Sequence, residues 1–336
     1  MIKRLAALVV VLALLYGAAW LGAAFWLRRS VDTIVADLVS QGYAIERGAP
    51  SFVGFPARVG IAFPHTSVRA PAARGAWRWG ADRVAVTLSA AAPTEPVIDL
   101  SGAHRITGFA SAPEGGLSVV VGRGRASLAF GADGSLENIV LKLSETRVGT
   151  SETPALFGFK DSSLHIALNT GHVTLWVREV SLAHEIAILG ETISALDLAL
   201  DVTGVLPSGP LRESLAAWRD NGGAIELRSF TLDWPPAHAS GNATLALDSA
   251  LQPLFAATVK FRGFFDIVAA LAAAGHVRER EASLAKVVLG MLARPSAAGE
   301  PELSLPLTVQ NRKLTAGPVP LMEIPAVVWD ETARVP

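Results

Sequence analysis

The chain has no cysteine among its 336 residues. This absence excludes disulfide bonds, thiolate metal sites and a cysteine nucleophile, and it is compatible with an oxidising compartment. Charge is also scarce, because only 18% of the residues are charged whereas 51% are hydrophobic. That balance is the reverse of the composition of disordered chains, so we predict a folded protein that buries a core.

Patterns that would carry metal binding or catalysis are missing. The histidines lack the His-x-x-x-His or His-x-His spacing that brings two ligands to one metal ion. They are His65, His104, His165, His172, His184, His238 and His276. Ser283 and Lys286 match the Ser-x-x-Lys motif of serine acyl-transfer enzymes, but the companion Ser-Asp-Asn and Lys-Thr-Gly motifs are absent, so we interpret both as helix surface. We predict no enzyme activity, no catalytic, cofactor-binding or metal-binding residue, and no cofactor.

Two other polar patterns have structural interpretations. Gly122-Arg123-Gly124 lacks the third glycine and the strand-to-helix crossover of dinucleotide binding, and we interpret it as a turn. Asp197 and Asp201 lie on one predicted strand among leucines and alanines. We interpret them as solvated acids at a strand edge rather than as a pair for acid and base catalysis.

A long hydrophobic run is what the sequence does contain. Leu5–Leu27 is apolar throughout and has two basic residues on each side. At a rise of ~1.5 Å per residue it can cross a bilayer core of ~30 Å, and it exceeds the ~7–15 residues of a signal-peptide core. We therefore predict a transmembrane anchor over residues 1–30.

Cleavage of this anchor is the alternative to its retention. Gly17-Ala18-Ala19 and Gly22-Ala23-Ala24 resemble the small-residue sites of signal peptidases. We favour retention because both sites lie inside the apolar run. The positive charges of the α-amine, Lys3 and Arg4 outweigh those after the run, which Asp32 offsets in part, so we place the body outside the cytoplasm.

The segment 31–42 has apolar residues at helical spacing and ends at Gly42, which predicts an amphipathic juxtamembrane helix. No acidic residue precedes Asp32. Without the four basic residues that flank the run, 25 basic residues face 30 acidic ones, a net charge of about −5 for the body. We therefore predict no nucleic-acid partner.

Beyond the anchor, apolar residues alternate with period two, which is typical of strands with one apolar face. Such runs include Val84, Val86, Leu88; Ile139, Leu141, Leu143; Leu164, Ile166, Leu168; Val173, Leu175, Val177; Leu196, Leu198, Leu200; Phe230, Leu232, Trp234; Phe255, Ala257, Val259, Phe261; and Leu303, Leu305, Leu307, Val309. Asn169-Thr170-Gly171 separates two of them closely enough to predict a hairpin, so neighbouring strands should be antiparallel.

Helices interrupt this pattern in the second half. Gly209-Pro210 is typical of a helix start and Asn221-Gly222-Gly223 of a helix end, and a helical pair is predicted near 266–274 and 284–292. The fold class is therefore α+β, with an N-terminal transmembrane helix and an elongated, curved, mainly antiparallel β-sheet body with a few covering helices. We divide the chain into an anchor (1–30), a juxtamembrane helix (31–42), a β-rich body (43–325) and a loose C-terminal tail (326–336).

Trp77 and Trp79 lie on one face of a predicted strand, with Arg78 between them. Core packing is the leading interpretation of these rings. An interfacial aromatic anchor and part of a ligand groove are the alternatives.

Motifs spread over nearly the whole chain resemble one bacterial family. They are Gly42-Tyr43, Ser51, Gly54-Phe55-Pro56, Arg58-Val59, Trp77-Arg78-Trp79, Arg125-Ala126-Ser127-Leu128, Ala217-Trp218-Arg219, Gly222-Gly223, Asp233-Trp234, Gly241, Leu247-Asp248, Pro306-Leu307 and Gly317-Pro318. With them the chain resembles the domain of unknown function 2125 (DUF2125). Ala57 and the segment 92–97 depart from the family pattern. The resemblance implies a membrane-anchored bacterial protein without an assigned reaction, similar in style to AsmA-like envelope proteins, whose curved sheets offer lipids an apolar trough.

Two hypotheses of function follow. The first is a single-pass protein of the bacterial inner membrane whose periplasmic body binds or conveys lipid, with the membrane and phospholipid as partners. The alternative is a structural or interaction scaffold of the cell envelope, whose sheet is covered by its own helices and whose partners are envelope proteins. We also expect the body without its anchor, residues 31–336, to be soluble.

Overall fold

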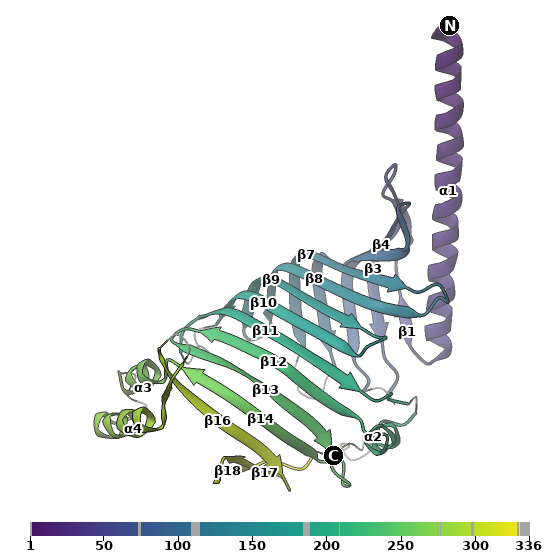
Figure 1. Ribbon diagram of the computed structural model, residues 1–336. Helices are drawn as coiled ribbons and strands as arrows, with labels where there is room; N and C mark the ends of the chain where they lie inside the picture. The colour runs from purple at the N-terminus through teal and green to yellow at the C-terminus, as the bar shows by residue number, and fades with distance from the viewer. Residues whose placement is uncertain are drawn as a thin grey trace. The chain divides into compact units, whose positions relative to one another are not determined.

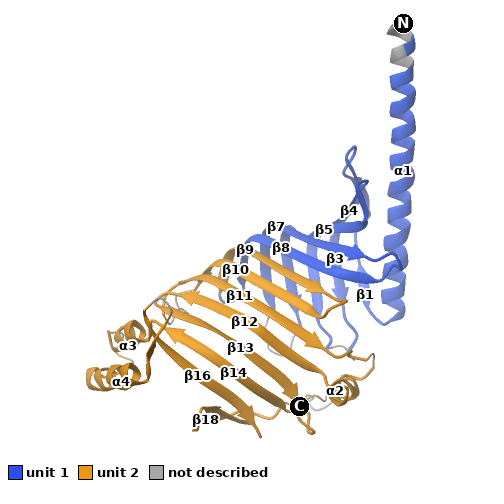
Figure 2. Ribbon diagram, viewed as in Figure 1, with its two compact units in different colours: residues 1–155 blue, residues 156–336 orange. Residues whose placement is uncertain are grey.

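The computed structural model describes residues 2–72, 75–108, 115–183, 189–207, 209–273, 275, 277–296, 299–327 and 329. The chain divides into two compact units, unit 1 (Met1–Ala155) and unit 2 (Leu156–Pro336; Figure 2). Each unit is built around an antiparallel sheet. The predicted α+β class is confirmed, with a long apolar helix followed by extensive antiparallel β-structure and a few further helices.

Unit 1 begins with one long helix, α1 (Ile2–Ser40; Figure 1). It contains the apolar run and continues without a break through most of the segment predicted as a separate juxtamembrane helix. Gly42 follows the helix end with a φ of 92°, a conformation that favours glycine. Among the described helices, α1 is the one long and apolar enough to cross a membrane, which is consistent with a signal anchor or a signal sequence.

The sheet of unit 1 has β3 and β4 near one edge and β7 and β8 at the other. Its strands are β1 (Ala44–Glu46), β2 (Ser51–Val53), β3 (Arg58–Arg69), β4 (Arg78–Ser89), β5 (Ala92–Asp99), β6 (Gly102–Thr107), β7 (Leu117–Phe130) and β8 (Leu136–Gly149). β3 pairs with β1 and β2 on one side and with β4 on the other. β5 and β6 both lie between β4 and β7, and β8 pairs with β7.

The core of unit 1 forms where α1 packs on this sheet. Leu27 contacts Ile61 and Phe63 of β3, and Ile61 has no exposed surface. Trp20, Ala24 and Leu27 are all buried and follow one another at helical spacing, so they form one stripe of α1. The second half of the apolar run therefore has one side covered by the protein itself.

Unit 2 is a succession of antiparallel hairpins. Its strands are β9 (Phe157–Ala167), β10 (His172–Leu182), β11 (Thr192–Thr203), β12 (Ala224–Trp234), β13 (Ala237–Leu247), β14 (Pro253–Arg262), β15 (Arg294–Pro295), β16 (Pro301–Gln310), β17 (Lys313–Ala316) and β18 (Val319–Glu323). Each strand from β9 to β13 pairs with the next, β14 pairs with β16, and β17 and β18 complete the order. The hairpin predicted at Asn169-Thr170-Gly171 is confirmed as the β9–β10 connection.

In the described part of unit 2, three helices interrupt the strands where the sequence predicts them, α2 (Leu211–Asp220), α3 (Phe264–Ala273) and α4 (Glu279–Leu292). The indole of Trp218 in α2 is buried and donates to the Thr203 carbonyl oxygen at 2.7 Å, which holds α2 at the end of β11. α3 and α4 pack against each other. The predicted apolar stripe of α4 is not packed on the sheet, because Leu284 and Met291 are 66% and 74% exposed.

Candidate functional site

One face of the unit 2 sheet is apolar across seven strands, β9 to β14 and β16, except at Ser162 of β9. The register aligns its side chains in three rows, which together form what we call the apolar face. The central row is Leu164, Leu175, Leu198, Phe230, Gly241, Val259 and Leu305, and the flanking rows are Ile166, Val173, Leu200, Leu227, Ala243, Ala257, Leu307 and Ser162, Val177, Leu196, Leu232, Ala239, Phe261, Leu303. Adjacent strands lie ~4.8 Å apart, so each row is about 29 Å long.

None of the helices that the structure describes in unit 2 closes the apolar face. Leu164, Leu175, Leu198 and Phe230 are only part-buried. Within the described part of unit 2, α4 packs on α3 and reaches β16, and no helix packs extensively on the strands from β9 to β14. An apolar surface that remains open in this way is typical of an interaction or ligand site.

The opposite face of the same strands is polar and carries ion pairs. His172 Nδ1 lies 2.8 Å from Asp201 Oδ1, and Arg228 also pairs with the Asp201 carboxylate. Arg178 pairs with Asp197 at 2.6 Å. The hydrogen bond with His172 is the main cause that lowers the pKa of Asp201, with Arg228 contributing in the same direction.

The interpretation of Asp197 and Asp201 as acids at a strand edge is wrong for both, and their expected solvation holds only for Asp197, whose side chain is half-exposed. β11 is an interior strand between β10 and β12, and Asp201 is buried. A carboxylate at such a position is stabilised by partners on both neighbouring strands, which the arginine and histidine supply. The cluster therefore joins three strands.

Replacing Asp201 tests this role through its pH dependence. Because the folded-state pKa is lowered, the carboxylate stabilises the fold above its ordinary pKa of about 3.9, and this contribution is lost as the pH falls through the lowered value. We expect Asp201→Asn to lower the thermal unfolding midpoint at pH 7, with the difference from wild type closing below about pH 4. The control is Asp197→Asn, which removes a half-exposed pair and should change the midpoint less. An Asp201→Asn difference that is equal at pH 3 and pH 7 would contradict this account.

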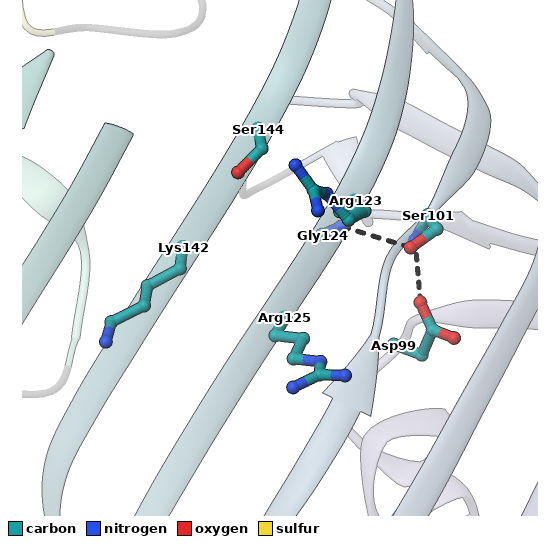
Figure 3. Close-up of a pocket in the computed structure, with 7 residues that line it drawn as sticks. All are labelled: Asp99, Ser101, Arg123, Gly124, Arg125, Lys142 and Ser144. Carbon is teal, nitrogen blue, oxygen red and sulfur yellow. Dashed lines mark hydrogen bonds between the residues drawn. The ribbon is translucent and has the colours of Figure 1, made fainter. Parts of the chain in front are cut away.

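A pocket of about 440 Å³ in unit 1 lies where β5 gives way to β6 (Figure 3). Leu100 N–H donates to the Gly124 carbonyl at 2.9 Å, and Gly124 N–H donates to Ser101 Oγ at 3.1 Å. A Cβ on Gly124 would lie 2.9 Å from the Leu100 oxygen, so this close approach requires glycine. The prediction of a turn at Gly122-Arg123-Gly124 is therefore wrong, because the three residues lie inside β7.

Three of the seven residues that line this pocket are basic, but their side chains do not converge. Arg123 pairs with Glu145 at 3.5 Å, and Asp99 pairs with Arg83 at 3.8 Å. In Figure 3 the side chain of Lys142 extends away from Arg125, its direct partner across β7 and β8. Without convergence on one point the cluster does not define a ligand site.

The other residues singled out in the sequence are dispersed. Ser283 and Lys286 lie on α4, where Ser283 is exposed, as the helix-surface interpretation requires. Trp79 stacks on His104 at 5.9 Å and Trp77 lies 6.3 Å from Tyr43, so both rings pack within unit 1. The remaining described histidines lie on separate strands, and His184 and His276 fall outside the described residues. The described residues include no group of three His, Asp or Glu that could hold a metal ion.

Sequence reasoning did not find two contacts that the structure shows. They are the Asp201 cluster and the packing of the β2–β3 turn on α1, and both join residues far apart in the chain. The alternating runs signalled the apolar face, but the alignment of its rows depends on strand order.

The family comparison agrees with the motifs. The chain belongs to the DUF2125 family, described as an uncharacterized protein conserved in bacteria, which matches residues 20–325. No curated protein matches the chain.

Proposed function

We propose that this protein is anchored in the bacterial inner membrane by α1 and holds lipid acyl chains against the apolar face. The observation that carries the proposal is the alignment of three apolar rows on an open sheet face. Each row, about 29 Å long, exceeds the ~15 Å that one leaflet's chains occupy in a bilayer core of ~30 Å. The face is therefore large enough for a whole acyl chain.

The energetics favour such a ligand. Burial of one methylene contributes ~0.8 kcal/mol, so contact with ten methylenes would contribute about 8 kcal/mol before the cost of ordering the chain. The bilayer in which α1 is anchored is the nearest source of acyl chains. The charge asymmetry around the apolar run supports a periplasmic body, where a lipid removed from the outer leaflet would need shielding from water.

Native mass spectrometry of the full-length protein, purified in detergent, tests the proposal. We expect a population that carries phospholipid, which is recovered by solvent extraction and identified by its mass. The control is a membrane protein of similar anchor length purified in the same detergent, because lipid held only by the transmembrane helix should appear in both. A protein that shows only its bare mass would contradict lipid binding.

The alternative function, an envelope scaffold without a ligand, receives support from a different surface. The exposed stripe of α4, with Leu284, Val287 and Met291, is an apolar surface that a protein partner could cover. The scaffold hypothesis assumes that the protein's own helices cover the sheet. The described helices of unit 2 do not cover it. We therefore place lipid binding first, and a bare mass together with a co-purifying protein would favour the scaffold.

A further inference from the structure

The turn between β2 and β3 packs on the apolar run of α1. We call residues 52–57 the hairpin tip. Tyr16 Oη donates to the Pro56 carbonyl oxygen, and Trp20 Nε1 donates to the Arg58 carbonyl oxygen at 2.8 Å. These are contacts between the sheet and residues inside the predicted membrane span.

Aromatic rings extend this contact. The Trp20 ring lies 5.4 Å from the Phe55 ring, and the Phe25 ring lies 5.2 Å from the Phe52 ring, both edge to face. Edge-to-face packing at these distances is a favoured arrangement of aromatic rings. The hairpin tip is therefore docked on α1 by both hydrogen bonds and rings.

The length of α1 determines where this docking lies relative to a bilayer. Tyr16 is the midpoint of the apolar run, about 16 Å from either end at ~1.5 Å per residue. The apolar residues that precede Tyr16, Leu5–Leu15, follow Lys3 and Arg4 and are only about 16 Å long, which is too short for a hydrocarbon core of ~30 Å. A spanning α1 must therefore carry the hairpin tip into the hydrocarbon region.

The chemistry of the hairpin tip suits that environment. The sequence Phe-Val-Gly-Phe-Pro-Ala has no charged side chain, and Phe55 is 62% exposed. In lipid, backbone polar groups must find partners within the protein. Proline lacks an N–H, the Tyr16 hydroxyl and the Trp20 indole satisfy two carbonyl oxygens, and Arg58 N–H donates to the Gly54 oxygen at 2.8 Å. Arg58, which follows the hairpin tip, is exposed, and arginine side chains can extend from apolar surroundings toward water.

We propose that the hairpin tip is a second membrane-inserted element, which lies beside α1 in the leaflet nearer the body. It fixes the edge of the unit 1 sheet at β2 and β3 within the acyl-chain region of that leaflet. The proposal rests on α1 as a membrane anchor and is independent of lipid binding by the apolar face, so either can fail alone.

The natural absence of cysteine makes a depth measurement direct. Full-length variants Phe55→Cys, Leu12→Cys and Ala132→Cys each carry one thiol, for an environment-sensitive NBD fluorophore. Leu12 lies in α1 and Ala132 in the exposed β7–β8 turn. The labelled proteins are reconstituted into vesicles of phosphatidylethanolamine and phosphatidylglycerol, with and without lipids that carry a doxyl quencher on the acyl chain.

We expect the label at position 55 to emit at short wavelength and to lose most of its emission to the doxyl lipids, as the label at position 12 does. The label at position 132 should emit as in water and remain unquenched. Phe55→Cys could disturb the ring packing, so Ala57→Cys, a smaller change in the same hairpin tip, is labelled as well. We expect the same result from it. Quenching of the label at position 12, together with water-like emission from the labels at positions 55 and 57, would overturn the proposal. Water-like emission from the labels at all four positions would also overturn the assignment of α1 as a membrane anchor.

Discussion

Removal of residues 1–30 is expected to destabilise unit 1 strongly rather than to release an intact soluble body. The deletion strips Trp20, Ala24 and Leu27 from the sheet and exposes Ile61 and Phe63. The loss of two large buried side chains costs about 1.5–3 kcal/mol each, and the lost indole hydrogen bond adds about 1 kcal/mol. The sum of about 4–7 kcal/mol is comparable with the total stability of a domain.

Deletion of residues 1–15 is the matched control. It removes half of the apolar run but keeps the stripe that packs on β3, so unit 1 should remain folded. Thermal unfolding followed by near-ultraviolet circular dichroism, in the same detergent throughout, compares the two deletion variants with the full-length protein. Equal midpoints for the two deletions would contradict a structural role of α1.

The sequence could not indicate that α1 packs on the sheet. Leu5–Leu27 is apolar on every side, so no periodicity distinguishes the buried stripe from the exposed surface. The helix end at Gly42 was predictable, because it rests on a local conformational preference that the sequence displays.

Local patterns predicted most of the elements, and non-local pairing decided the rest. The alternating runs and turn residues correctly placed the β9–β10 hairpin and the helices of unit 2. Asp201 was misplaced because an edge strand and an interior strand have the same local pattern, and only the order β10, β11, β12 distinguishes them. The prediction of a turn at Gly124 is wrong because glycine suits a turn and a close approach of two backbone segments equally well.

The apolar face could be predicted from the sequence only in part. Period-two alternation gave each strand one apolar side, but it did not show that the apolar sides of seven strands align. Nor did it show whether helices cover them. The exposed stripe of α4 illustrates the point, since its spacing predicts an amphipathic helix but not the surface on which it packs.

Site-specific photo-crosslinking should give an all-or-none difference between the two faces of the unit 2 sheet. Leu198 lies in the central row of the apolar face, and Thr231 lies on the adjacent strand β12 with its side chain on the opposite face. The two strands are ~4.8 Å apart, so the two residues are close neighbours in the sheet, but their side chains lie on opposite faces. Benzoylphenylalanine, incorporated at either position of the full-length protein, reacts on irradiation with C–H bonds that it touches.

Photo-crosslinking at the two positions in intact cells, followed by mass analysis of the purified protein, tests whether lipid binds the apolar face. We expect a phospholipid adduct at position 198 and none at position 231. Absence of an adduct at position 198, with the protein present in the membrane in normal amount, would contradict lipid binding by the apolar face. Equal adducts at both positions would contradict it as well, because they would show contact with lipid that does not distinguish the two faces.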